Sequence, residues 1–302
     1  MTRTRKLLHN LFDFERRETV GEIIFYRFFE LVIVYYTIKY AWRWGPYMER
    51  LSDIVLPLGI AEYVDLTFMF DNHLGTINAI LITVMVLVGY FRLWRYAYLA
   101  TLLLFHLHYA ARYSQGEISH GSNMVAMIVL SLAVATLAFE HRKEIRRAAM
   151  GLSYFFIGLS YTSAALCKLG ASGPLWVDGR HLWMWIQERT VDKFSLTGAI
   201  EHTWLQELTI EYHLLATAIL TFGLLVEFFA FLMWYKRLRP YVMIALVGMH
   251  LGIWGVMQIT FSSNTYILLI LAFPVAHLID LALRRLDATK FEKLRTLSLR
   301  LT

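Results

Sequence analysis

The amino-acid sequence predicts an all-α integral membrane protein, a polytopic bundle of about eight transmembrane helices with both termini in the cytoplasm. Hydrophobic residues make up 58% of the 302 residues, which is the composition of a membrane protein. Eight apolar runs are each long enough to cross a bilayer. The basic residues lie in clusters between these runs, a pattern typical of inserted membrane proteins.

The predicted spans cover most of the chain. In order, they lie at 21–42, 74–91, 96–114, 120–140, 148–169, 208–235, 240–261 and 264–283. The first is too long for the apolar region of a signal peptide and no A-x-A cleavage site follows it, so we expect it to be retained. Because the sequence shows no internal repeat and no separate soluble domain, residues 1–302 are expected to form a single transmembrane domain.

The distribution of basic residues predicts the topology. Of the 29 lysines and arginines, 20 lie in the N-terminal segment, in three alternate connections and in the tail from Arg284. With eight spans all of these face the cytoplasm, as the positive-inside rule requires, whereas one span more or fewer would place clusters on both sides. Residues 1–20 are then a cytoplasmic tail. Residues 284–302 are a basic cytoplasmic tail, either an amphipathic helix on the anionic leaflet or a frayed end.

This charge pattern gives no indication of nucleic-acid binding, and membrane lipid is the expected neighbour. The opposite side of the membrane holds the less regular connections. Residues 170–207 form the longest, and we expect a loop whose tryptophans make an interfacial belt or a cap over the bundle. Residues 43–73 are too polar to span, which favours an interfacial amphipathic segment.

Lys168, at the end of the fifth predicted span, carries the most chemical information. Tyr154, Tyr161 and Lys168 are spaced by seven, so they lie along nearly one helix face. The small residues Ala164 and Ala165 would let another helix approach closely. A lysine in this position is either an interfacial anchor whose stem reaches the headgroups or part of a polar pocket. The residues alone leave both interpretations open.

Other ionisable residues lie within the predicted spans, where an unpaired charge is costly. Arg27 and Glu30 are three apart and can form a structural ion pair, or Arg27 can contact a substrate. Glu227 has no cation four residues away, so it needs a proton or a partner on another helix. Arg27 is the best candidate for that partner by depth. His277 and Asp280 are expected to form a local pair.

The histidines show no metal-binding spacing, and no metal site is predicted. His106 and His108 are two apart, so at most one of them faces a site, and hydrogen-bonded packing is the simplest interpretation of both. His250 is followed at intervals of four by Trp254 and Gln258, which predicts one polar and aromatic helix face.

The start of the fourth predicted span combines several polar residues. His120 and Asn123 are three apart on one face, and Gly121 lets a backbone or ligand approach closely. A binding site here and a helix N-cap formed by Ser119, Ser122 or Asn123 both fit this pattern. The sequence contains no P-loop, dinucleotide fingerprint or Gly-x-Ser-x-Gly elbow.

Lys168-Leu169, followed by Trp176-Val177-Asp178-Gly179, resembles the KKL…WVEG region of the vitamin K-dependent γ-glutamyl carboxylases and of their bacterial relatives with the horizontally transferred transmembrane (HTTM) domain. In that family the second lysine of the pair is the base in vitamin K hydroquinone oxygenation. Lys168 matches this lysine, whereas Cys167 stands at the first. The late spans around His250 and the FSSNTYILL stretch are also similar to the family.

The resemblance implies a membrane enzyme of the bacterial-type inner or plasma membrane, multi-pass, that acts on a quinol or similar lipid-soluble substrate. The implied cofactor is a reduced, vitamin K-like quinone, with Lys168 as the base and His120 or His250 binding or polarising the ring. The implied substrate contacts are Tyr161, Asn123, Trp176, Asp178, Gly179, Trp254, Glu227 and Arg27. The carboxylases add a large soluble domain that docks their protein substrate. Without one, oxygenation of the ring or work with a separate partner is favoured over glutamate carboxylation.

Two other classes of function are considered. One is a non-catalytic HTTM membrane partner in the maturation or export of a secreted peptide, since some HTTM proteins resemble such components. The other, a carrier for a small apolar molecule, is disfavoured because the sequence has no inverted repeat and no paired broken helices. Co-purification of a quinone would favour the enzyme, and co-purification of a secreted peptide would favour the partner.

The charge pattern makes a prediction about topology. A reporter fused at the C-terminus or at Arg142 should lie in the cytoplasm, and one inserted in 170–207 should lie outside it, because basic connections are retained on the cytoplasmic side. Fusions to alkaline phosphatase, active only outside, and to green fluorescent protein measure both. A cytoplasmic 170–207 segment would contradict the eight-span topology.

Overall fold

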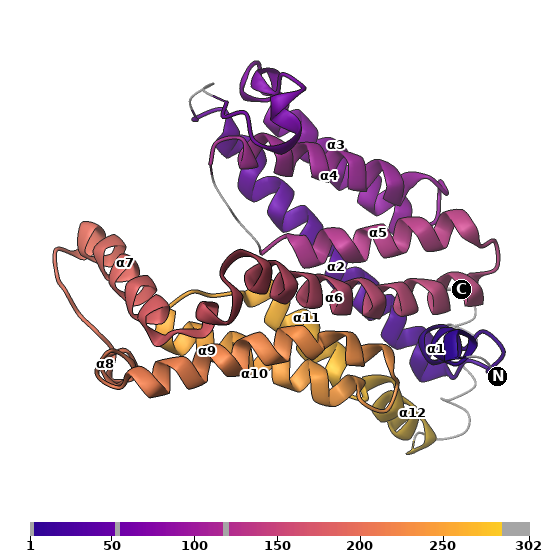
Figure 1. Cartoon of the computed structure of the whole chain (residues 1–302). Helices are drawn as coiled ribbons and strands as arrows, with labels where there is room; N and C mark the ends of the chain where they lie inside the picture. Colours follow the sequence, from indigo (N-terminus) through magenta and orange to yellow (C-terminus); the bar gives the residue numbers. More distant parts are fainter. Residues whose placement is uncertain (1–2, 52–54, 117–120, 286–302) are drawn as a thin grey trace. The chain divides into compact units, whose positions relative to one another are not determined.

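The computed structural model describes residues 3–51, 55–116 and 121–285, and every regular element among them is helical (Figure 1). With 3₁₀ turns labelled η, the elements are α1 (Arg3–Leu11), α2 (Val20–Met48), η1 (Gly59–Glu62), η2 (Thr67–Phe70), α3 (Leu74–Tyr90), α4 (Ala97–Tyr113), α5 (Asn123–Ala138), α6 (Arg142–Ser172), η3 (Gly173–Val177), α7 (Gly179–Thr197), α8 (Trp204–Glu211), α9 (His213–Phe228), η4 (Phe229–Trp234), α10 (Arg239–Met257), α11 (Ser262–Ala272) and α12 (Val275–Arg285). The prediction of an all-α fold is confirmed. His120 and the tail beyond Arg285 lie outside the described residues.

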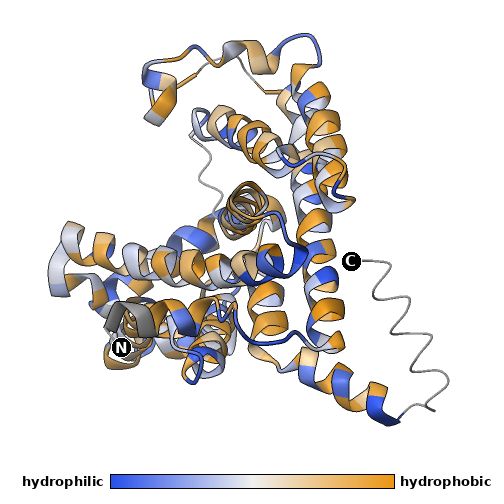
Figure 2. Cartoon of the chain, turned by 90° about the vertical axis from the view of Figure 1, so that its right-hand side faces the viewer, coloured by the Kyte–Doolittle hydropathy of each residue, from blue (hydrophilic) through white to orange (hydrophobic). Residues whose placement is uncertain are grey.

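Several helices have the length and composition of membrane spans. In the part of the chain that the structure describes, three stretches qualify, namely Arg142–Val177, His213–Trp234 and Arg239–Met257. The pair α11 and α12 adds a fourth if it is one broken span. Hydrophobic residues make up much of the helices (Figure 2), and many are exposed, for example Phe222, Leu225 and Leu251. Apolar side chains on the outside suit helices surrounded by lipid, so the fold is that of a membrane protein.

Each predicted apolar run forms helix, although the boundaries differ. α2 starts with a capping box, in which Thr19 and Glu22 satisfy each other's backbone N–H groups. It continues beyond the predicted span to Met48, with Pro46 in its last turn. The last predicted run breaks between α11 and α12 because Pro274 favours an extended residue before it, and Phe273 has ψ of 146°.

The chain divides into two compact units, and each is described separately. The first unit comprises Met1–Ser153 with Pro274–Thr302, and the second comprises Tyr154–Phe273. In the first unit α2 is the central helix and packs against α3, α4, α5 and α12. The largest fully buried side chains of this unit include Phe29, Ile33, Ile82, Tyr98 and Phe105. Whether residues 1–302 form a single domain, as the sequence predicts, is not tested by this division into units.

Two glycines set the approach of α2 to α3. A Cβ built on Gly45 would lie 2.7 Å from the carbonyl oxygen of Gly75, and one on Gly75 would lie 2.6 Å from the carbonyl oxygen of Gly45. Such distances leave no room for a side chain, so the two backbones touch directly. Small residues permit this close packing between membrane helices.

The contact between α12 and α2 corrects a prediction about Asp280. The carboxylate accepts a hydrogen bond from the backbone N–H of Gly21 at 2.8 Å, instead of forming the expected local pair with His277. The first backbone N–H groups of a helix have no partner within the helix and carry positive partial charge. Asp280 therefore satisfies the start of α2 and fixes α12 beside it.

In the second unit the expected loop 170–207 is mostly helical, so that prediction was wrong. α6 continues to Ser172, and α7 and α8 follow. The physical reason is a short apolar stripe: Leu182, Ile186 and Thr190 recur every four residues and are buried. α7 packs against α9, and α10 packs against α9, α11 and η4. The central apolar cluster consists of Leu182, Ile186, Ala216, Leu220 and Val256.

The N-terminal tail contains regular structure that was not predicted, while the polar connection 43–73 contains only short turns beyond the end of α2. The tail 1–20 contains α1. Residues 43–73 begin with the end of α2, and their described remainder contains the single turns η1 and η2. The interfacial position of this segment stays a prediction. Residues 52–54, within this connection, lie outside the described part of the chain.

The glycine contact predicts a stability change. Gly45→Ala places a methyl group against the Gly75 backbone, so we expect a loss of about 1–3 kcal/mol in the free energy of unfolding, as for other overpacked sites. Gly170→Ala is the matched control, because a Cβ there would meet nothing within 4 Å. Denaturant unfolding in detergent, followed by circular dichroism, measures both. Equal stabilities of the two variants would contradict the close contact.

Candidate functional site

An ion pair joins Lys168 of α6 to Glu227 of α9 in the second unit. Lys168 Nζ donates a short hydrogen bond to Glu227 Oε2. Glu227 is 8% exposed, while the Lys168 side chain retains 30% of its exposure. The predicted interior position of Glu227 is confirmed. The predicted partner was wrong, because Lys168 and not Arg27 neutralises this carboxylate.

Trp176 lies against the same ammonium group. The Lys168 Nζ is 4.8 Å from the centre of the Trp176 ring, a cation–π contact. Lys168 therefore has two partners, a carboxylate and an aromatic face, and its charged group is directed at protein. This arrangement favours the pocket interpretation of Lys168 over the interfacial anchor.

Asp178 and Gly179 hold this region in place. Asp178 caps α7 by accepting a hydrogen bond from the backbone N–H of Arg180 at 2.9 Å. Its carboxylate also accepts from the Arg180 side chain at 3.0 Å and lies 2.9 Å from His213 Nε2. Because the Arg180 side chain, its backbone N–H and His213 stabilise the charged form, the pKa of Asp178 is well below its usual range.

Gly179 allows α7 to meet α9. A Cβ at this position would lie 2.5 Å from the carbonyl oxygen of His213, and the Gly179 N–H donates to Thr217 Oγ1 at 3.0 Å. The segment 176–179, Trp-Val-Asp-Gly, thus connects α6 to α7 and holds α7 against α9, and we call it the joint. Its aspartate starts α7, its glycine lets α9 approach, and its tryptophan is left facing Lys168.

A largely apolar pocket of about 540 Å³ lies next to the ion pair. Its charged lining residues are Lys168 and Glu227, and the remainder of the lining comes from α7, α9, α10 and their neighbours. Two of the lining residues, Gly248 and Gly252 on α10, face open space, since a Cβ on either would meet nothing within 4 Å. The pocket therefore owes part of its volume to a helix face without side chains.

His250 and Tyr161 form a second polar contact behind this pocket. The Tyr161 hydroxyl and His250 Nε2 are 2.6 Å apart, and the His250 ring lies 5.1 Å from that of Phe261. Phe261 lines the pocket, whereas His250 and Tyr161 do not. His250 is 5% exposed, so its predicted interior position is confirmed, and it supports the pocket wall from behind.

The predicted polar face of α10 was wrong beyond His250. Trp254 is 51% exposed, and Gln258 is an exposed residue that ends the helix in a left-handed conformation. With 3.6 residues per turn, Trp254 lies about 40° and Gln258 about 80° around the helix from His250. His250 is buried whereas Trp254 is exposed, and the structure does not bring Trp254 to the pocket.

Arg27 belongs to a different cluster, in the first unit. The predicted pair is confirmed, since Arg27 Nη1 lies 2.6 Å from Glu30 Oε2. Glu30 is fully buried and also binds Arg92 Nη2 at 2.7 Å and the Tyr98 hydroxyl at 2.6 Å. The sequence analysis missed Arg92 and Tyr98, although Arg92 directly follows a predicted span.

The remaining polar residues of the first unit occupy separate places. His108 is buried and accepts from Asn78 Nδ2 at 3.2 Å, whereas His106 is exposed, which confirms that only one of the two points inward. Asn123 and His106 line a small pocket near the start of α5. Ser122 is the N-cap residue of α5 but makes no capping hydrogen bond through its side chain.

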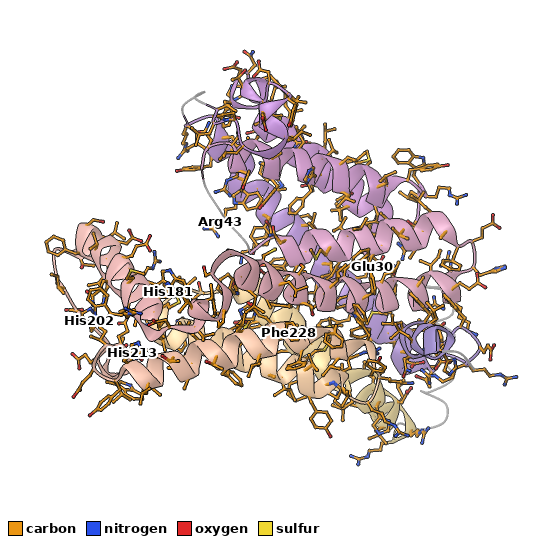
Figure 3. All side chains as sticks on the ribbon, in the orientation of Figure 1. Glu30, Arg43, His181, His202, His213 and Phe228 are labelled. Atoms are coloured by element: carbon orange, nitrogen blue, oxygen red, sulfur yellow. The ribbon has the colours of Figure 1, made fainter. Side chains whose placement is uncertain are left out.

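Three histidines lie around the junction of α7, α8 and α9 (Figure 3). Each has a partner within the fold: His181 lies 3.2 Å from the Trp176 carbonyl oxygen, His202 lies 3.0 Å from Thr190 Oγ1, and His213 binds Asp178. No group of three or more histidine, cysteine, aspartate or glutamate residues suited to a metal ion occurs in the described part of the chain. These histidines therefore act as hydrogen-bonding residues of the joint.

No protein-family model, curated protein or solved structure matches the chain. The resemblance to the carboxylases stays a prediction from the residues that carry it. Function is therefore argued from the ion pair, the pocket and the joint that holds them.

The ion pair makes a prediction about stability. Glu227→Gln leaves the Lys168 ammonium without a carboxylate, so we expect a loss of about 1–3 kcal/mol, less than for a fully buried pair because Lys168 is partly exposed. The double variant Lys168→Met/Glu227→Leu should recover most of this loss, because apolar replacements of buried ion pairs are often neutral. Denaturant unfolding in detergent measures the changes.

The matched control is Glu201→Gln, whose partner Lys193 lies on the surface with a 3.5 Å separation. This variant should change stability by less than about 0.5 kcal/mol. If Glu227→Gln is no more destabilising than Glu201→Gln, the Lys168–Glu227 pair does not stabilise the second unit.

Proposed function

We propose that the chain is a membrane enzyme that binds a reduced quinone or similar lipid-soluble ring in the pocket of the second unit, with Lys168 as the base. The observation that carries the proposal is a single ion pair in the wall of an otherwise largely apolar pocket. Sites for small molecules commonly have about 300–1,000 Å³ and a few placed polar groups in an apolar lining. The 540 Å³ pocket fits that description.

A reduced quinone supplies a ring hydroxyl and the electrons for reaction with O2. Lys168 accepts the hydroxyl proton when its amine is neutral, and Glu227 provides the route to that state by taking the proton that now lies in their shared hydrogen bond. Trp176 then stabilises the ammonium group that Lys168 becomes.

Four of the other predicted site residues have supporting roles in this proposal. Asp178 and Gly179 hold Trp176, while Tyr161 and His250 support Phe261 from behind. We also propose that the protein is multi-pass in a bacterial-type inner or plasma membrane, with eight spans and cytoplasmic termini. The basic clusters support that topology.

The second candidate function is a non-catalytic partner of a secreted peptide. It is favoured by the ion pair itself, because Lys168 and Glu227 neutralise each other without a ligand. In that case the pair is structural, and the pocket holds an apolar segment of the peptide. A base role and a structural role predict different outcomes for arginine at position 168.

The proposed base role predicts that Lys168→Arg lowers quinol turnover by about 100-fold or more, the usual contribution of a general base. A guanidinium group keeps its proton at physiological pH and cannot act as a base. The variant should still bind quinone, because the apolar part of the pocket lining is unchanged. Oxidation of a reduced menaquinone by the purified protein, followed by absorbance, measures turnover, and tryptophan fluorescence quenching measures binding.

Two further variants sharpen this experiment. Lys193→Arg changes an exposed lysine in the same unit and should leave turnover unchanged. Gly252→Leu fills open pocket space and should weaken quinone binding. Full turnover in Lys168→Arg would end the base role. Unchanged binding in Gly252→Leu would separate the quinone from this pocket.

A further inference from the structure

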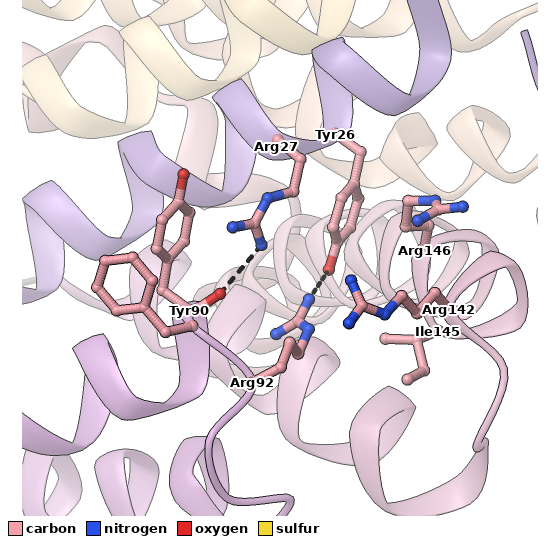
Figure 4. A pocket seen from close by; sticks show the side chains of 8 residues that line it. Tyr26, Arg27, Tyr90, Arg92, Arg142, Ile145 and Arg146 are labelled. Carbon is pink, nitrogen blue, oxygen red and sulfur yellow. Dashed lines mark hydrogen bonds between the residues drawn. The ribbon is translucent and has the colours of Figure 1, made fainter. Parts of the chain in front are cut away.

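The first unit contains a second pocket, of about 220 Å³, that the proposed function does not use (Figure 4). Four arginines line it, from α2, from the connection after α3 and from the start of α6: Arg27, Arg92, Arg142 and Arg146. Tyr26 and Tyr90 complete most of the wall. Figure 4 shows the guanidinium groups of Arg27, Arg92 and Arg142 directed toward a common space beside the Tyr26 hydroxyl.

Two of these arginines are held rigidly. Arg27 donates to the Tyr90 carbonyl oxygen at 3.1 Å and lies 4.0 Å from the centre of the Tyr90 ring. Arg92 donates to the Gly89 carbonyl oxygen at 2.9 Å and to the Tyr26 hydroxyl at 3.0 Å. Buried Glu30 binds both guanidinium groups. Because the positions of these side chains are fixed before a ligand binds, little side-chain entropy would be lost on binding.

The arginines outnumber the carboxylates that neutralise them. Glu30 serves both Arg27 and Arg92, and Glu18 serves Arg146 at 2.7 Å. Within the described residues the guanidinium group of Arg142 has no hydrogen-bond or ion-pair partner. The four positive charges thus face two negative ones, and the surplus lies at the pocket.

We propose that this pocket binds a phosphoryl group, either in the headgroup of an anionic lipid or in free phosphate. Planar guanidinium groups match the oxygens of phosphate through paired hydrogen bonds. The Tyr26 hydroxyl, which accepts from Arg92, has its own hydrogen to donate. Arg142 lies in the first turn of α6, and the start of a helix carries positive partial charge that favours an anion. A volume of 220 Å³ suits one oxyanion group, since drug-sized ligands commonly need about 300 Å³ or more.

Arg142 is the residue to change, because it is exposed and unpaired in the described structure, so its loss should not unfold the protein. In Arg142→Gln we expect about tenfold weaker binding, the usual effect of one lost charge-assisted hydrogen bond. Arg142→Lys should recover only part of the affinity, because an ammonium group keeps the charge but lacks the paired, planar N–H donors of a guanidinium group. Isothermal titration calorimetry on the full chain in detergent, with inorganic phosphate and separately with short-chain phosphatidic acid, measures binding.

Arg17→Gln is the matched control, because Arg17 is an exposed arginine of the same unit outside the pocket. It removes the same charge and should leave affinity within about twofold, since solvent and salt screen a distant exposed charge. Binding of phosphatidic acid alone assigns the pocket to lipid headgroups, binding of phosphate assigns it to a free anion, and either result supports the phosphoryl site. The proposal is overturned if neither probe binds, or if Arg17→Gln weakens binding as much as Arg142→Gln.

Discussion

The cost of placing charge in an apolar environment governs the second unit. Glu227 lies in the apolar helix α9 and needs a cation, which Lys168 supplies from α6. This pairing fixes the last turns of α6 beside α9. The chain must then turn back so that α7 also packs on α9, and Asp178 and Gly179 make that turn possible. Trp176, between Lys168 and the start of α7, is held against the ammonium group as a result.

The two units use charged residues in opposite ways. In the second unit one cation and one carboxylate balance each other, so the adjacent pocket presents mainly apolar surface and favours an uncharged ligand. In the first unit Glu30 is shared by two arginines, and further arginines gather nearby. Because positive charge is left over there, the second pocket favours an anion. The same cost of buried charge therefore leaves two pockets with different linings, one mainly apolar and one rich in arginine.

The sequence predicted what depends on one helix and failed where the answer depends on several. Apolar runs located the helices, and the spacing of Arg27 and Glu30 predicted their pair, because helix geometry fixes both. The partner of Glu227 was mispredicted because a contact between helices depends on packing that depth along the sequence does not specify. α7 was missed because the four tryptophans of 170–207 suggested an interfacial loop, while the repeat of Leu182 and Ile186 at a helical spacing was too short to stand out.

The resemblance to the carboxylases rests on residues that have structural roles in this chain. Asp178 caps a helix, Gly179 permits a close approach, and Trp176 covers a lysine, so the motif would be retained in a bundle without any catalytic activity. The glycines on the pocket-facing side of α10 have no such structural role. Gly248 and Gly252 touch nothing beyond their own helix, and larger residues there would fill space and add apolar contacts. Gly248 is exposed, so the space beside it opens from the surface and is not a void inside the fold. This glycine face, together with the adjacent ion pair, supports the proposed binding of an apolar ligand.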